Sequence, residues 1–150
     1  MRKVIAIYQI FSGVVGALMA VGSIIDLFQG FNLKAFSFLA VMLSISIFLV
    51  YCGLRLFLFQ SSQIFKLNFL SQAIQIVSFS VGGFHFMFFF GLPVYCSLES
   101  SEGVELKFGA GLSKFAISTG ADPDFFSISI NLVAVVLALW FWEKWKQEEV

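Results

Sequence analysis

Polar side chains recur every three or four residues between positions 68 and 85, in a stretch otherwise rich in phenylalanine and leucine. The set comprises Asn68, Ser71, Gln72, Gln75, Ser78 and His85, and Asn131 offers a partner from a later apolar stretch. At ~100° per residue, a helix would place this set on one face. Polar side chains in a membrane helix usually face the interior of a bundle or a water-filled cavity. The spacing therefore predicts a polar seam that either holds helices together or lines a path for a solute.

His85 is the one histidine of the chain, and Asp26 is its predicted neighbour. Both lie near the end of an apolar run, so an outward-running helix would bring them to similar depth at the outer membrane interface. Paired, they could form a pH-sensitive latch or half of a metal site. Unpaired, they are two polar groups in headgroup water, which is the interpretation we favour because ionisable side chains cost little there.

Cysteine chemistry is limited to Cys52 and Cys96, and no Cys-x-x-Cys pair occurs. This excludes a thiol-redox motif and a cysteine-rich zinc site within one chain. We therefore expect neither a cofactor nor a bound metal.

Small residues cluster in the first apolar run at the spacing of helix turns: Ser12, Gly13, Gly16, Ala17 and Ala20. Small side chains at four-residue intervals let two helices approach closely. The partner could be another helix of this chain or a second copy of the chain, and we favour the first.

The composition points to lipid as part of the solvent. Of the 150 residues, 59% are hydrophobic and 12% are charged, and the mean hydropathy is +0.95. A water-soluble domain carries about 25% charged residues. Four apolar runs, at about 4–28, 35–59, 67–90 and 125–145, each exceed the ~20 residues that span a bilayer as a helix. We therefore predict an all-α membrane protein, a single domain of four transmembrane helices.

Charge sets the predicted orientation. Six of the nine lysines and arginines fall on one side of the four predicted spans: Arg2, Lys3, Arg55, Lys66, Lys144 and Lys146. Because positive charge marks the cytoplasmic face, both termini are predicted to lie on the cytoplasmic side of the membrane. The predicted location is the cell membrane, as in the inner membrane of a bacterium. The alternative of a cleaved signal peptide stays open, but the first run is long for one.

The segment of about 91–124 is the predicted outside loop. Val104, Leu106 and Phe108 alternate with charged residues, which is the period-two pattern of a strand. After the Gly109–Gly111 turn, Leu112–Thr119 is predicted to return as the second strand of a small β-hairpin lying across the helix ends.

Three functions remain open. The favoured one is a non-catalytic accessory or structural membrane subunit, not an enzyme, whose partners are the lipid bilayer and a protein partner or further copies of itself. The alternative is a small channel or transporter that uses the seam between the third and fourth helices. An enzyme acting on lipid or quinone through His85 has the weakest support, because one histidine lacks a mid-span partner. The zero net charge argues against nucleic acid as a partner.

Overall fold

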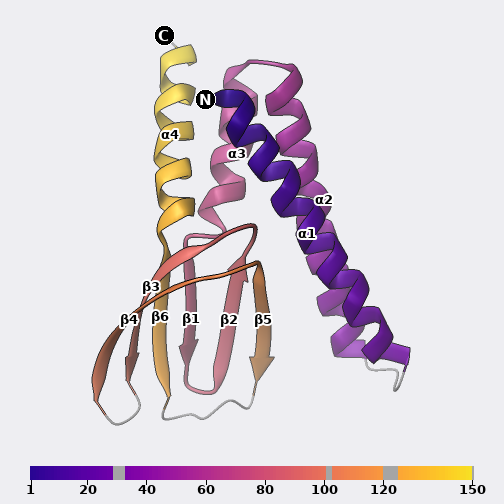
Figure 1. Ribbon diagram of the computed structural model, residues 1–150, viewed down its shortest axis with the longest axis vertical. Helices are drawn as coiled ribbons and strands as arrows, with labels where there is room; N and C mark the ends of the chain where they lie inside the picture. The colour runs from indigo at the N-terminus through magenta and orange to yellow at the C-terminus, as the bar shows by residue number, and fades with distance from the viewer. Residues whose placement is uncertain (29–32, 101–102, 120–124, 150) are drawn as a thin grey trace.

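The computed structural model describes residues 1–28, 33–100, 103–119 and 125–149. Two long helices, α1 (Arg2–Phe28) and α2 (Leu33–Leu58), form an antiparallel hairpin that runs along the molecule (Figure 1). The short helix α3 (Ser62–Ala73) and the C-terminal helix α4 (Leu132–Glu149) lie side by side next to one end of this hairpin. Both termini lie at that same end (Figure 1).

The remaining described elements form one antiparallel sheet below α3 and α4. Its strands are β1 (Val77–Val81), β2 (Phe84–Phe89), β3 (Val94–Ser100), β4 (Val104–Ala110), β5 (Lys114–Thr119) and β6 (Phe126–Asn131). The order across the sheet is β4-β3-β6-β1-β2-β5. The central strand β6 continues directly into α4, and α3 leads through a short turn into β1. The sheet is therefore connected directly to α3 and α4 and lies at their lower ends (Figure 1).

Two groups of apolar residues hold these parts together. At the helical end, Ile5 and Leu56 of the hairpin pack with Phe65 of α3 and Phe141 of α4. Further along, Phe88 and Phe90 pack against Leu49 of α2, with Phe115 of β5 beside them. The hairpin thus packs against the helices at one end and the β2–β5 side of the sheet at the other.

The prediction of an all-α bundle of four transmembrane helices is wrong. The predicted third span, 67–90, contains the last part of α3 followed by strands β1 and β2. The predicted fourth span, 125–145, begins with strand β6 before it becomes helical. In the sequences of 77–81 and 126–131, serine alternates with β-branched or aromatic residues, and this period of two is typical of a strand. Total hydropathy over a window does not register that period.

The predicted hairpin is also wrong in its pairing. Strands occur at β4 and β5, close to the predicted positions, but β4 pairs with β3 and β5 pairs with β2. The two lie at opposite edges of one larger sheet. Three further strand pairings supply hydrogen-bond partners for the backbone groups of the strands between them. A single hairpin would leave many of these backbone groups without a partner strand.

The first two predicted spans coincide with α1 and α2. Among the described residues, the helical segments Arg2–Gly22 and Phe36–Leu58 are long and apolar enough to cross a membrane, by length and composition. A four-helix, multi-pass architecture is not what the chain forms.

Candidate functional site

The predicted seam residues from α3 lie buried where the helices meet the sheet. Asn68, Ser71, Gln72 and Gln75 are each at most 3% exposed. Gln75 follows the last turn of α3, where its backbone N–H donates to Gln72 at 2.9 Å and thereby extends the helical face by one residue. These four residues thus lie on one helical face that reaches Gln75, although the helix itself ends at Ala73.

Hydrogen bonds tie this group to α1 and α2. The Asn68 Nδ2 atom donates to the carbonyl of Ile64 at 2.7 Å and to that of Cys52 in α2 at 3.5 Å. The Ser71 hydroxyl donates to the Asn68 carbonyl at 2.7 Å. From α1, the fully buried Gln9 donates through Nε2 to that hydroxyl at 3.2 Å. Gln9 was not among the sequence candidates because its neighbours in the chain are almost all apolar.

Gln75 connects α3 to the β2–β3 turn. Its Nε2 atom donates to the Ser71 carbonyl at 2.9 Å, and its Oε1 atom accepts the backbone N–H of Phe90 at 3.1 Å. The next backbone N–H, that of Gly91, donates to the buried hydroxyl of Ser113 at 2.8 Å. Gly91 has φ +79°, and a Cβ there would collide with the Ser12 hydroxyl. Only glycine fits this turn against α1.

Asn131 performs a different role at the end of β6. Its Oδ1 atom accepts the backbone N–H of Ala134 at 3.3 Å, which makes Asn131 the N-cap of α4. Its own backbone N–H donates to Ile76 at 2.8 Å, just before β1. The exit of α3 and the entry of α4 are thus joined by one hydrogen bond. We call the buried group formed by Gln9 of α1, by Asn68, Ser71, Gln72 and Gln75, and by Asn131 the polar joint.

Ser78 and His85 lie beyond the joint, on the sheet. In the strand register, Ser78 pairs with Ser129, while Ser80 pairs with both Ser127 and His85. Directly paired residues share a face, so these side chains lie on one polar face of the sheet. Its serines, Ser78, Ser80, Ser97, Ser127 and Ser129, are all buried. The alternation of serine with apolar residues is the signal that could have identified this serine face.

The predicted pair of Asp26 and His85 cannot be placed, since the side chain of Asp26 lies outside the described residues. His85 itself lies on β2, half-buried, rather than on a transmembrane helix. Within the described part of the chain, no group of three or more histidine, cysteine, aspartate or glutamate side chains could hold a metal ion. Cys52 and Cys96 are free thiols.

The small residues of α1 lie against α2 and the turn of the sheet. A Cβ on Gly13 would lie 2.7 Å from the Ser46 carbonyl of α2. One on Gly16 would lie 2.6 Å from the Phe90 ring. Ala20 is buried with Leu39 and Met42 of α2. The Ser12 hydroxyl donates to the Tyr8 carbonyl of the same helix. Ala17 lines an apolar hollow formed by residues of α1 and α2.

The chemistry available at the polar joint is that of amides and hydroxyls. Two acceptor oxygens, Gln9 Oε1 and Asn68 Oδ1, are buried without a protein partner, so each could accept a hydrogen bond from an internal water. Neither group exchanges protons near neutral pH. The arrangement is suited to fixing helices against a sheet rather than to acid–base catalysis.

Comparisons with models of protein families, with curated proteins and with solved structures find no match to this chain.

Proposed function

We propose that this chain is a membrane protein without a catalytic role, which serves as an accessory or structural subunit. The observation that carries the proposal is the polar joint. Its side chains are buried and bond to one another and to backbone groups, as shown by Gln75, which bridges α3 and Phe90. Such contacts hold elements in place, and they give no support to a solute path along the seam.

The orientation follows from the end of the molecule that carries both termini. Lys146 lies 4.8 Å from the Trp142 ring centre, and Lys66 lies 5.2 Å from that of Trp145. The N-terminal Arg2 donates to Gln60 at 2.9 Å, and Gln60 donates to Glu148 of α4 at 3.1 Å. Tryptophan with lysine is typical of a membrane interface, and excess positive charge of the cytoplasmic side. We propose that the α1–α2 hairpin crosses the cell membrane and that this end of the molecule lies in the cytoplasm.

The test is purification of a tagged copy at native expression level in a mild detergent, followed by mass determination and identification of what co-purifies. We expect a larger membrane protein in fixed stoichiometry. Recovery of the chain alone, as a monomer or a homo-oligomer, would contradict the accessory role.

A matched pair of variants shows whether a partner recognises the assembled fold. Gln75→Ala removes the bridge to Phe90 and the bond to the Ser71 carbonyl, whereas Gln63→Ala changes an exposed residue of α3. We expect the first variant to lose the partner and the second to retain it. Equal retention by both would mean that the polar joint does not shape the binding surface.

A further inference from the structure

The sheet has two faces of opposite polarity, and the strand register assigns every described position to one of them. Leu98 of β3 pairs with Ile128 of β6 and with Leu106 of β4. One residue earlier, Ser97 pairs with Ser129 and Lys107. The face opposite the serine face is therefore apolar across four strands. Its exposed residues include Val77, Val81, Val94, Leu98, Leu106, Phe108, Ile128 and Ile130.

The burial of the two faces is the reverse of that in a water-soluble protein. Phe108 is 72% exposed and Leu106 is 61% exposed, while Ser78 and Ser80 are each 1% exposed. Each Å² of apolar surface left in water forgoes about 25 cal/mol, and large exposed apolar patches mark contact with another apolar phase. Something apolar must therefore cover this face.

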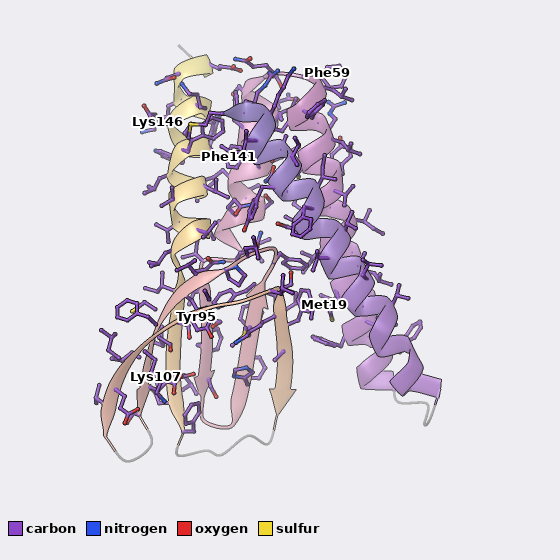
Figure 2. The ribbon with its side chains drawn as sticks, viewed as in Figure 1. Met19, Phe59, Tyr95, Lys107, Phe141 and Lys146 are labelled. Carbon is purple, nitrogen blue, oxygen red and sulfur yellow. The ribbon has the colours of Figure 1, made fainter. Side chains whose placement is uncertain are left out.

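Exposed apolar residues also follow the apolar face along the chain, onto α4. Because β6 runs directly into this helix, exposed Leu132, Val136 and Leu139 extend the surface toward Trp142. At the other end of the sheet, Lys107 bonds to Glu99 at 2.8 Å and approaches Glu105 at 3.3 Å. Figure 2 shows Lys146 beside α4 and Lys107, on β4, toward the opposite end of the sheet.

The length of that column matches a bilayer. From Leu132 to Trp142 the helix rises about 15 Å, and β6 adds a similar length down to the level of Glu99, which pairs with Ser127. The apolar stretch between the tryptophan–lysine end and the ionic end is therefore about 30 Å, the thickness of the hydrocarbon core.

The two edge strands of the sheet curve toward each other at the end next to α3 and α4. Residues 111–113 alone join β4 to β5, although these strands form opposite edges. At this end, Lys114 of β5 donates across the serine face to the Tyr95 hydroxyl of β3 at 3.0 Å, and Gly109 lies against the Tyr95 ring. The sheet thus curls around its serines. Open sheet edges are not tolerated in hydrocarbon, and the curl draws both edges toward the polar side at this end.

We propose that the apolar face of the sheet lies against the acyl chains of the bilayer, so that the sheet is inserted in the membrane beside the helical hairpin. The acyl chains are the occupant that fits an uncharged face bounded at one end by tryptophan and lysine and at the other by an ion-paired cluster. This inference goes beyond the accessory role and holds with or without a protein partner.

The test is site-directed spin labelling of the full chain in vesicles of phosphatidylcholine and phosphatidylglycerol. The neighbours Leu106→Cys and Glu105→Cys are a matched pair, because both side chains are well exposed but lie on opposite faces. Cys96 is replaced by serine in the background, and Cys52 is retained since it is 1% exposed. Collision rates with oxygen, which partitions into lipid, and with a water-soluble nickel chelate are then compared.

We expect the label at position 106 to favour oxygen and the label at position 105 to favour nickel. Ile128→Cys, on a central strand, should behave as position 106 does. If the nickel chelate reaches position 106 as readily as position 105, the apolar face lies in water and the proposal is wrong. Strong spin–spin broadening at 106 or 128 would show that a second copy covers the face, which would also overturn it. Circular dichroism confirms that each variant retains the fold.

Discussion

Single side chains at the polar joint add hydrogen bonds to the apolar contacts that hold the sheet to the helices. Gln75 is the clearest case, since its amide satisfies the buried N–H of Phe90 and a carbonyl of α3 at the same time. A buried donor left without an acceptor costs about 1–3 kcal/mol. The stability of the whole chain should therefore depend on this one amide.

Replacing Gln75 by alanine should lower the free energy of unfolding by about 1–3 kcal/mol, because the Phe90 N–H loses its acceptor. The measurement is equilibrium unfolding in mixed micelles of sodium dodecyl sulfate and a mild detergent. Gln63→Ala, on the exposed side of α3, should leave the midpoint unchanged. An equal effect of both variants would contradict the bridging role.

Glu99 confers a pH dependence at the ionic end of the sheet. The hydrogen bond from Lys107 at 2.8 Å holds the pKa of the Glu99 carboxyl below its ordinary value of 4.5. A lowered folded-state pKa contributes stability above pH ~4.5 that is lost as the pH falls toward the folded value.

We expect acid to destabilise the unmodified chain more than Glu99→Gln, and the difference to be small because the carboxylate is partly exposed. Unfolding midpoints at pH 7 and pH 3 provide the comparison. Glu143→Gln, on exposed α4 surface, should retain the full acid effect. Identical pH profiles for Glu99→Gln and the unmodified chain would exclude this contribution.

At the scale of elements, the contact between α1 and its neighbours depends on where small residues fall along the helix. Gly16 lies against the Phe90 ring and the Ser46 hydroxyl, whereas a Cβ on Gly22 of the same helix would meet nothing within 4 Å. Both glycines lie in α1, so substituting either one changes helix propensity to the same extent. A difference in stability between the two variants therefore measures packing.

Gly16→Leu should be less stable than Gly22→Leu by about 1–3 kcal/mol, because the larger side chain must displace a ring and a neighbouring helix. Thermal unfolding of the purified variants in detergent measures the difference. If both variants had the same melting temperature, α1 would not pack against Phe90 as the structure shows.

At the scale of the whole molecule, polarity is arranged along one axis and around one sheet. Cationic and tryptophan side chains gather at the end that carries both termini (Figure 1), the middle is apolar on its outer surface, and an ion-paired cluster closes the far end. The hairpin, α4 and the apolar face share this order. In the placement that we propose, one membrane position would satisfy all three.

Tags that carry a protease site, added to each terminus, should be cleaved from the same side of the membrane. We expect both to be protected in intact cells and both to be removed in inverted vesicles, because the termini lie at one end. Cleavage of one tag in intact cells while the other is protected would contradict the hairpin as a pair of crossings.

The sequence alone determined where the apolar stretches lie and identified the first two helices within two residues of their ends. It also identified the polar residues of α3 that lie buried, because their helical spacing is a local property. The alternation in 104–108 predicts a strand, and β4 is one. The same alternation occurs in 77–81 and 126–131, but the high hydropathy there favours a transmembrane helix, and that prediction is wrong.

Only the tertiary structure decided which strands pair and which face is buried. β4 and β5 are neighbours in sequence, yet they lie at opposite edges of the sheet, because their ladder hydrogen bonds go to β3 and β2. Gln9 and Ser71 are far apart in the chain and meet only when α1 packs on α3. Local spacing encodes the shape of an element, whereas pairing and burial depend on contacts between distant residues and on the solvent around them.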